Sequence, residues 1–305
     1  MSGPVRIGEE VRGALEAGRG VVALETLVIG QGLPAPRNLE CVDRMEQAIR
    51  GAGSIPAWIA VAGGELVAGI GPDMLAQLAE PGTAVKAARK DLPAVAAGGG
   101  LGATTVSATI WAAASAGITV GATGGIGGVH PGPDPDVSAD LVELARTPGM
   151  LVSSGPKSIV DPGRTAERLE ELGVALVGYG VDRLPFFLAR EAPVELTHRV
   201  DDPAAAAALV AAARDLGVHS TVLLCNPIPA SAAMDQADAA AVAAEAEGRA
   251  RVAGVAGAAR TPFLLAAMAE ISGGRTLEAN LALLEDNARV AGEVAAALAE
   301  RSDVT

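Results

Sequence analysis

The stretch TVGATGGIGGVHPGPDPDVSAD, residues 119–140, decides which fold the sequence predicts. It begins as a short apolar strand, Ile118–Ala122, and continues into residues 123–129, where glycines let backbone N–H groups approach a ligand closely. His130 and a proline-braced acidic loop follow, and Ser138 is placed to cap an amphipathic helix. This combination is typical of an active-site loop at the carboxyl edge of an α/β sheet. The alternative is a glycine-rich connection with a solvated acidic tip.

Apolar runs alternate with helical patterns on both sides of this loop. The runs predicted as buried strands are 21–24, 57–62, 149–154 and 221–225. The helical patterns of the last third are 230–251, 261–272 and 277–298. A first helix is expected over Val5–Ala17. Because no internal repeat or linker interrupts the chain, we expect a single α/β domain over residues 1–305.

The composition excludes several classes of partner. Half of the 305 residues are hydrophobic and only 2% are aromatic, so alanine, valine and leucine must form the core. The formal net charge of −13 argues against nucleic acid and anionic membranes as partners. Cys41 and Cys225 lack metal-ligand spacing and are expected to be reduced thiols. With no apolar signal core and no apolar run of about 18 residues, a cytoplasmic protein is expected.

Three charged positions stand out. Glu25 ends an apolar run, and Lys157 follows another in a Gly-Pro turn. Lys86 belongs to a cluster with Arg89 and Lys90, the densest basic patch of an acidic chain. For this cluster, phosphate capture and a solvated turn are both open interpretations. From its position alone, Lys157 is more often a surface lysine than an amine nucleophile.

Two asparagines and a phenylalanine pair are further candidates. Asn280 and Asn287 are seven residues apart and share one helix face. Such asparagines usually cap a helix or face solvent, whereas a buried pair could read the edge of a heterocycle. The segment Leu184–Leu188 contains two of the three phenylalanines and is expected to be core or pocket wall.

Eight short motifs follow one another in a fixed order along the chain. They are VVALET at 21–26, KAARKDLP at 86–93, GATTV at 102–106, ATGGIGGVH at 122–130, DVSADL at 136–141, GPKSI at 155–159, NPIP at 226–229 and TPFLL at 261–265. In these motifs, their order and their spacing, the chain resembles the pseudouridine-5′-phosphate glycosidases from about residue 5 to residue 300.

This resemblance implies a three-layer α/β/α single domain with a mainly parallel central sheet, a homotrimer, a sugar-phosphate substrate and a divalent metal. It implies that Glu25 is the proton donor, Lys157 the Schiff-base nucleophile and Asp136 the metal ligand. The positions expected to contact the substrate are Lys86, Val106, His130, Ser138, Ala139, Asp140 and Asn280.

The chemistry of the family explains these residue types. Pseudouridine joins ribose to uracil through carbon, which is a poor leaving group. A proton on the ring oxygen opens the ribose and exposes C1′ to an amine, and formation of the imine then lets the C–C bond break. A single aspartate ligand implies a hard, largely water-coordinated ion such as Mn²⁺ or Mg²⁺.

The chain departs from the family just after the first predicted strand. Family members usually read LESTIISHGMP, whereas residues 24–34 read LETLVIGQGLP. Thr26-Leu27 and Gly30-Gln31 thus replace a Ser-Thr and a Ser-His pair, so we expect retained sugar-phosphate chemistry with a changed aglycone. The primary prediction is cleavage of pseudouridine 5′-phosphate to uracil and ribose 5-phosphate. The alternative is a C-glycosynthase, similar to the alnumycin C-glycosynthase branch, that attaches ribose 5-phosphate to an aromatic polyketide.

Two other classes of function are less consistent with the sequence. A sugar or nucleoside kinase would explain the glycine-rich loops, but no GxxxxGK[ST] motif occurs. Glu25 and Lys157 would also have no role in a kinase. A phosphate-binding regulator would use the basic cluster and would need neither an acid nor a nucleophile.

Overall fold

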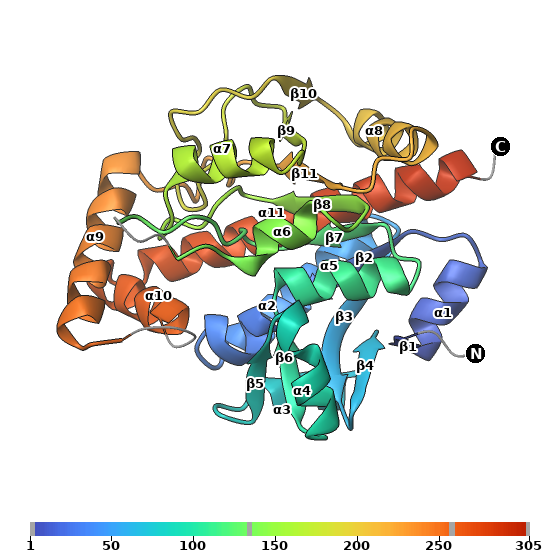
Figure 1. The fold of residues 1–305 in the computed structure, drawn as a ribbon, viewed down its shortest axis with the longest axis horizontal. Coiled ribbons are helices and arrows are strands. Elements are labelled where there is room, and N and C mark those ends of the chain that lie inside the picture. The colour runs from blue at the N-terminus through green and yellow to red at the C-terminus, as the bar shows by residue number, and fades with distance from the viewer. Residues whose placement is uncertain (1–3, 133–135, 256–259, 303–305) are drawn as a thin grey trace.

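The computed structural model describes residues 4–132, 136–255 and 260–302, and one mixed sheet is its centre (Figure 1). The strands of the described part are β1 (Arg6–Ile7), β2 (Val21–Glu25), β3 (Ile55–Ala62), β4 (Glu65–Ala68), β5 (Ala84–Ala87), β6 (Leu101–Thr104), β7 (Val120–Ala122), β8 (Gly149–Ser153), β9 (Leu176–Tyr179), β10 (His198–Val200) and β11 (Thr221–Cys225). Their order is β1-β4-β3-β2-β7-β8-β11-β9-β10, with β6 joined to β3 and β5 joined to β6. All pairs are parallel except β3 with β4 and β3 with β6.

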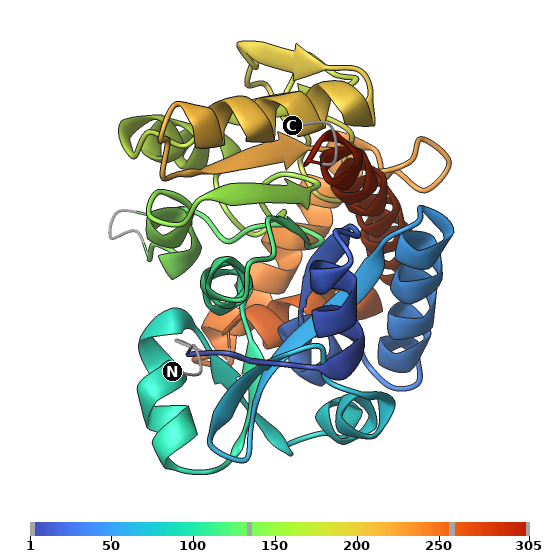
Figure 2. The same ribbon diagram turned by 90° about the vertical axis from the view of Figure 1, so that its right-hand side faces the viewer.

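Helices cover both faces of this sheet. They are α1 (Glu9–Glu16), α2 (Arg37–Gly51), α3 (Pro72–Ala79), α4 (Leu92–Ala97), α5 (Val106–Ser115), α6 (Ala139–Leu144), α7 (Pro162–Glu171), α8 (Pro203–Asp215), α9 (Gln236–Val252), α10 (Arg260–Ile271) and α11 (Arg275–Ser302). A π-helical turn, η1 (Val28–Gly32), and a 3₁₀ turn, η2 (Arg89–Asp91), complete the set. Figure 2 shows α2 and α11 on one side of the sheet and α5 and α6 on the other. Within the described residues, no helix has the length and apolar character needed to cross a membrane.

The alternation of side chains along β2 explains the layers. Successive strand residues point to opposite faces, so a fully buried strand feeds two cores. Val22 and Leu24 belong to the apolar cluster that contains the inner faces of α2 and α11. Val21 and Ala23 belong to the cluster formed with α1 and α5. The strand is therefore apolar throughout until Glu25.

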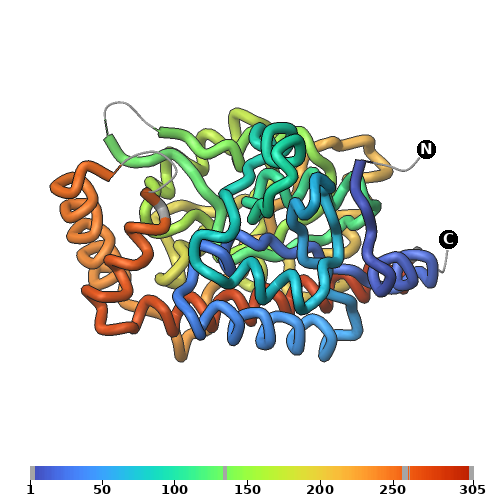
Figure 3. Tube along the Cα trace, turned by 90° about the horizontal axis from the view of Figure 1, so that it is seen from below, coloured from blue at the N-terminus to red at the C-terminus, as the bar shows by residue number. Residues whose placement is uncertain are grey.

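The close contact between α2 and α11 depends on a glycine. A Cβ atom at Gly292 would lie 2.8 Å from Cβ of Ala52 and 3.2 Å from Cα of Ile49. The missing side chain lets the two helices run side by side along one edge of the molecule (Figure 3). Gly292 interrupts the helical pattern of the sequence without breaking the helix, because its small size is used for packing.

The predicted architecture is confirmed: the protein is a single three-layer α/β/α domain with a mainly parallel sheet and a helix-rich C-terminal third. The predicted helix over residues 5–17 is wrong in its first turn. Arg6 and Ile7 form β1, which pairs in parallel with β4, and the Gly8 N–H donates to the Ala68 carbonyl oxygen at 2.8 Å. The open edge of β4 offers these first residues sheet hydrogen bonds, and α1 begins only at Glu9.

Candidate active site

Four of the predicted positions line one cavity of about 40 Å³ at the carboxyl edge of the sheet. Glu25 ends β2, Lys86 lies in β5, Lys157 follows β8, and Asn280 comes from α11. Gly124 and Gly125 contribute backbone atoms to the wall of this cavity. Parallel strands bring their carboxyl ends to one edge, and a glycine turn leaves room for side chains from other elements.

Glu25 is held as a buried carboxyl group. Its side chain is 6% exposed, and the Thr123 hydroxyl donates a hydrogen bond to Oε1 at 2.5 Å. The register of β2 with β7 pairs Leu24 with Ala122 and so places Thr123 beside Glu25. Burial raises the pKa of Glu25, while Lys157, Thr123 and Lys86 oppose this increase. The raised pKa favours the protonated form, which is the form that can donate a proton.

Lys157 reaches the cavity from a turn that requires glycine. Gly155 has a φ of 75°, and a Cβ there would lie 2.0 Å from the Pro185 carbonyl oxygen. The Lys157 N–H then donates to the Ile126 carbonyl oxygen at 3.0 Å, which joins this turn to the glycine loop after β7. Lys157 is half-buried, and its ammonium has no ion-pair partner among the described residues. Its amine is therefore available to a ligand.

The basic cluster around Lys86 is divided by the structure. Lys86 lines the cavity, whereas Arg89 donates to both oxygens of Glu143, at 2.6 and 2.7 Å, and lies over the Trp111 ring. Lys90 is exposed and pairs with the neighbouring aspartate. Neither open interpretation of the cluster applies to all of it, because only Lys86 is placed to meet a ligand in this cavity.

The predicted substrate contacts at Ser138, Ala139 and Asp140 form the start of α6. Ser138 caps this helix, as the sequence predicts, by accepting from the Asp140 N–H at 3.2 Å. The Asp140 carboxylate is buried and accepts from the N–H groups of Ser107 at 3.1 Å and Gly127 at 3.0 Å. It therefore fixes the glycine loop to the start of α5. Ala139 is exposed.

The first residue of α5 is Val106, another predicted contact. Its side chain is buried, and the helix begins without a side-chain cap from Thr105. Neither Val106 nor the start of α6 lines the small cavity. Their contacts with a substrate stay predictions.

The predicted metal ligand Asp136 is exposed and lies in the loop between β7 and α6. Among the described residues its carboxylate has no hydrogen-bond or ion-pair partner, and no group of three or more His, Cys, Asp or Glu side chains could hold a metal there. The His130 N–H donates to the Asp136 carbonyl oxygen at 2.9 Å, and His130 Nδ1 is buried without a partner in that part of the chain. Burial lowers the pKa of His130. Asp136 fits a hard ion that keeps water as most of its ligands and does not fit an all-protein cage. Asp134, another carboxylate of this loop, is outside the described residues.

The two asparagines of α11 have different surroundings. The Asn280 amide has no hydrogen-bond partner among the described residues and faces the cavity. Asn287 is fully buried, and its Nδ2 donates to the Thr123 carbonyl oxygen at 2.8 Å and to Ser154 Oγ at 3.1 Å. Asn280 alone is free to read a ligand edge.

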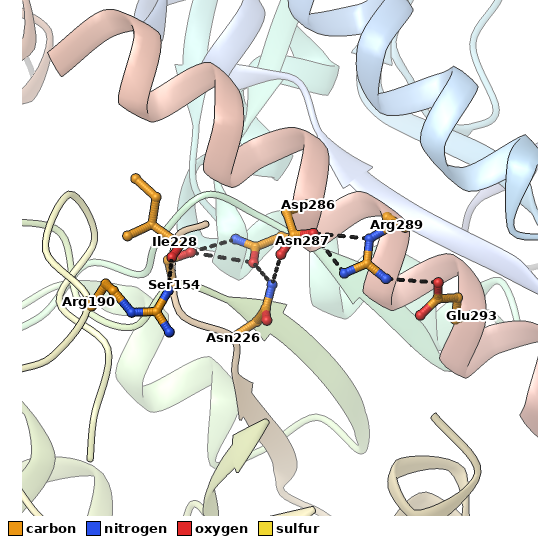
Figure 4. Close-up of polar contacts among 8 residues, drawn as sticks. All are labelled: Ser154, Arg190, Asn226, Ile228, Asp286, Asn287, Arg289 and Glu293. Carbon is orange, nitrogen blue, oxygen red and sulfur yellow. Dashed lines mark hydrogen bonds and ion pairs between the residues drawn. The ribbon is translucent and has the colours of Figure 1, made fainter. Parts of the chain in front are cut away.

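A network of side chains surrounds Asn287 (Figure 4). Asn226, from the NPIP motif, donates through Nδ2 to Asn287 Oδ1 at 3.0 Å and to Asp286 Oδ2 at 2.8 Å. Arg289 in turn donates to Asp286 at 2.7 Å. The sequence alone indicated no role for the NPIP motif. In the structure the motif stabilises the orientation of Asn287, which holds the backbone beside Glu25.

The positions that depart from the family pattern face different parts of the structure. Thr26 Oγ1 donates to the Ile59 carbonyl oxygen at 2.7 Å, so this hydroxyl serves the sheet and not the cavity. A Cβ at Gly30 would lie 3.2 Å from the Leu78 carbonyl oxygen, on the side of the core. Leu27 and Gln31 line the cavity with Glu25. The expected change of aglycone therefore depends on these two positions.

Phe187 forms part of the cavity wall, as predicted for its segment. Its φ of 52° is unusual for a residue with a side chain, and its N–H donates to the Ser154 carbonyl oxygen at 2.7 Å. A Cβ at Gly125 would lie 2.7 Å from the Phe187 ring, so the glycine loop and the ring are in direct contact.

The fold and the site define an α/β enzyme with a buried carboxyl group and an amine in one pocket. The chain belongs to the family of the pseudouridine-5′-phosphate glycosidases: the family model described as "Indigoidine synthase A like protein" matches residues 10–297, and the curated relatives carry the glycosidase name. It is therefore an enzyme of the glycosidase and C-glycosynthase type.

Three similar proteins illustrate this membership. A pseudouridine-5′-phosphate glycosidase of Sorangium cellulosum is 46% identical over 300 residues, covering 96% of this chain and 93% of its own. The solved structure of the prealnumycin C-glycosynthase AlnA in complex with ribulose 5-phosphate is 40% identical, covers 100% of both chains and has a TM-score of 0.90. An indigoidine synthase A-like protein of Thermotoga maritima is 35% identical, covers 97% of this chain and 96% of its own, and has a TM-score of 0.85.

Proposed function

We propose that the protein cleaves the C–C glycosidic bond of pseudouridine 5′-phosphate, with water, to uracil and ribose 5-phosphate. The observation that supports this most is the shared cavity of Glu25, Lys157 and Lys86, in which Glu25 has a raised pKa and Lys157 has no ion-pair partner among the described residues. The names of the relatives support the substrate.

Glu25 starts the reaction as a general acid. Its proton goes to the ribose ring oxygen, which also takes the electron pair of the C1′–O bond as the ring opens. The Lys157 amine adds to C1′ and passes one of its protons to the Glu25 carboxylate, which restores the lone pair on the nitrogen. As the bond from C1′ to the uracil carbon breaks, its electron pair goes to uracil, and the nitrogen lone pair forms the C=N bond of a protonated imine. Uracil takes up a proton at that carbon, and water hydrolyses the imine to ribose 5-phosphate and the free amine.

The sugar phosphate needs positive charge in this acidic protein. Lys86 supplies it from β5, and Asp136 would hold a hard divalent ion, Mn²⁺ or Mg²⁺, that neutralises phosphate charge when bound. The contacts assigned to Val106, His130, Ser138, Ala139, Asp140 and Asn280 are part of the same proposal. Replacing Asp136 with Ala should weaken Mn²⁺ binding in isothermal titration, and an unchanged affinity would contradict that assignment.

We further propose that the protein acts in the cytoplasm as a homotrimer. Light scattering after size-exclusion chromatography tests the oligomeric state, and a mass of one chain would contradict it.

A second candidate is bond formation by a C-glycosynthase that attaches ribose 5-phosphate to an aromatic polyketide. One observation favours it: Leu27, an apolar side chain, lines the cavity beside Glu25 where family members usually carry threonine. The similarity to the solved structure of the prealnumycin C-glycosynthase also supports bond formation.

The experiment that tests the proposed function is uracil release from pseudouridine 5′-phosphate with Mn²⁺ present, followed by absorbance and by mass spectrometry of the sugar product. Stoichiometric uracil and ribose 5-phosphate support the glycosidase. No release, together with C-glycoside formation from ribose 5-phosphate and a phenolic acceptor, supports the synthase.

A further inference from the structure

We infer that Asp286 is a positioning residue for the reaction: it fixes the orientation of two buried amides, and these hold the segments of Glu25 and Lys157 together. The inference rests on the proposed function, in which those two residues are the acid and the nucleophile. Asp286 lies on α11, its side chain is 22% exposed, and it does not line the catalytic cavity. Its effect on the reaction therefore passes through other residues.

Asn287 joins the two catalytic segments. Its Nδ2 donates to the Thr123 carbonyl oxygen at 2.8 Å, directly after β7, and to Ser154 Oγ at 3.1 Å, directly after β8. The Thr123 hydroxyl donates to the Glu25 carboxyl group. Ser154 begins the turn that carries Lys157. One amide therefore ties the strand end beside the acid to the strand end before the nucleophile.

The Asn287 amide can make these contacts in one orientation only. A carbonyl oxygen accepts hydrogen bonds and cannot donate them, so the Nδ2 side of Asn287 has to face Thr123. The Oδ1 side then needs a donor, which Asn226 supplies through Nδ2 at 3.0 Å from the end of β11, the strand next to β8. If the Asn287 amide were turned over, oxygen would meet oxygen at one end and N–H would meet N–H at the other.

Asn226 also carries an amide, so its orientation has to be fixed as well. Asp286 Oδ2 accepts from Asn226 Nδ2 at 2.8 Å. An ionised carboxylate has no donor, so it selects the Nδ2 side of Asn226 and rejects the Oδ1 side. A hydrogen bond to a charged acceptor is also stronger than one between two neutral amides. The negative charge of Asp286 therefore sets the direction of the whole chain of amides (Figure 4).

Arg289 holds Asp286 without competing for the oxygen that Asn226 uses. It donates to Asp286 Oδ1 from Nε at 3.0 Å and from Nη2 at 2.7 Å, which leaves Oδ2 to the amide. Arg289 also donates through Nη1 to Glu293 Oε1 at 2.8 Å. In the described part of the chain, Glu293 has no hydrogen bond to either amide. Glu293 is therefore a matched control, because it pairs with the same arginine outside the chain of amides.

The test measures how fast ribose 5-phosphate forms an imine on Lys157, trapped by excess borohydride and followed by intact-mass spectrometry. Asp286→Ala should lower the rate at saturating sugar phosphate by at least about fivefold, and the half-saturating concentration should stay within about twofold of the parent's, because Lys86 is unchanged. Asp286→Asn keeps one acceptor oxygen and should return the rate to within about threefold of the parent. Glu293→Ala should leave the rate unchanged.

Asn226→Ala removes the amide that Asp286 orients, so it should show the same loss, and it carries the test if Asp286→Ala does not fold. The two changes combined should be no slower than Asn226→Ala alone, because both act through one chain of contacts. Parental rates in these variants, an equal loss in Glu293→Ala, or a change confined to the half-saturating concentration would overturn the positioning role. A parent that is never labelled would overturn the proposed function instead.

Discussion

The two sides of the pocket are built on different physical principles. On the proton-donor side, Glu25, Thr123, Asn287 and Asn226 form a buried chain of hydrogen bonds in which each group has a definite partner. On the opposite side, the neighbouring cavity of about 440 Å³ has a mostly apolar wall, and no charged side chain lines it within the described residues. Directional bonds tolerate little change, whereas apolar packing tolerates many side chains of suitable size. We infer that such a pocket preserves one sugar chemistry while the aglycone varies.

Lys157→Ala should have the largest effect, because it removes the group proposed to bond covalently to C1′. We expect turnover to fall on the order of 10³-fold or more, with binding of ribose 5-phosphate retained through Lys86. Uracil release and isothermal titration measure the two quantities. A variant that keeps more than about 5% of the parent rate contradicts the nucleophile assignment.

Glu25→Gln should lower turnover by about 10²- to 10⁴-fold, the usual contribution of a general acid. Because burial raises the pKa of Glu25 above its ordinary value of 4.5, the parent should stay active above that pH and lose activity as pH rises through the raised value. Thr123→Val removes a hydrogen bond that lowers this pKa, so it should move the alkaline limb to higher pH. If the alkaline side of the pH–activity profile stays at the same pH or moves to lower pH, ionisation of Glu25 is excluded as its cause.

The same shift predicts a change in stability. Above the ordinary pKa the unfolded chain ionises Glu25 freely while the folded protein resists ionisation, so the parent loses stability as pH rises. Glutamine cannot ionise. The Tm of Glu25→Gln should therefore increase relative to that of the parent as pH rises above the ordinary pKa of 4.5, and a constant difference would contradict the raised pKa.

Asn287→Ala tests whether the buried network positions the acid. The change leaves the Thr123 carbonyl oxygen without its donor, and we expect kcat to fall by about 5- to 150-fold while KM changes little, because Asn287 does not line the cavity. Ser54→Ala is the control: its hydroxyl donates to the Gly292 carbonyl oxygen of the same helix, at 2.7 Å, without lining either cavity. A purely structural role for Asn287 would give both variants a lower Tm and an unchanged kcat.

The smallest effect on turnover is expected for substitutions at the positions proposed to face the aglycone. Leu27→Thr with Gln31→His restores the usual family residues at the two departures that line the cavity, and uracil release should rise about tenfold. Gly30→Ser added to this pair should bring no further gain, because its side chain would face Leu78 and the core. Equal rates for the parent and the double variant would show that these positions do not select the aglycone.

Much of the site could be predicted because its main residues stand at strand ends. A carboxylate after four apolar residues drew attention to Glu25, whereas the position of Lys157 alone favoured a surface lysine and its role was predicted from the family resemblance. The cavity that Lys157 shares with Phe187 and α10 could not be inferred, since these come from distant parts of the sequence. The same applies to Asn287, whose partner Thr123 is 164 residues away.

The neighbouring cavity of about 440 Å³ could also not be predicted from sequence patterns. Its walls come from η1, α10 and the first turn of α11, and each contributes ordinary apolar residues that read as core. Periodicity shows which residues are buried, but the spaces left between distant elements depend on how these pack.

The central claim is that a lysine imine on the ring-opened sugar underlies the reaction, and borohydride reduction in the presence of ribose 5-phosphate tests it most directly. The account predicts that intact-mass spectrometry finds one sugar phosphate attached per chain, that peptide mapping locates it on Lys157, and that Lys157→Ala is unlabelled. An unlabelled parent that still releases uracil at full rate, or a label on another lysine that persists in Lys157→Ala, would contradict it.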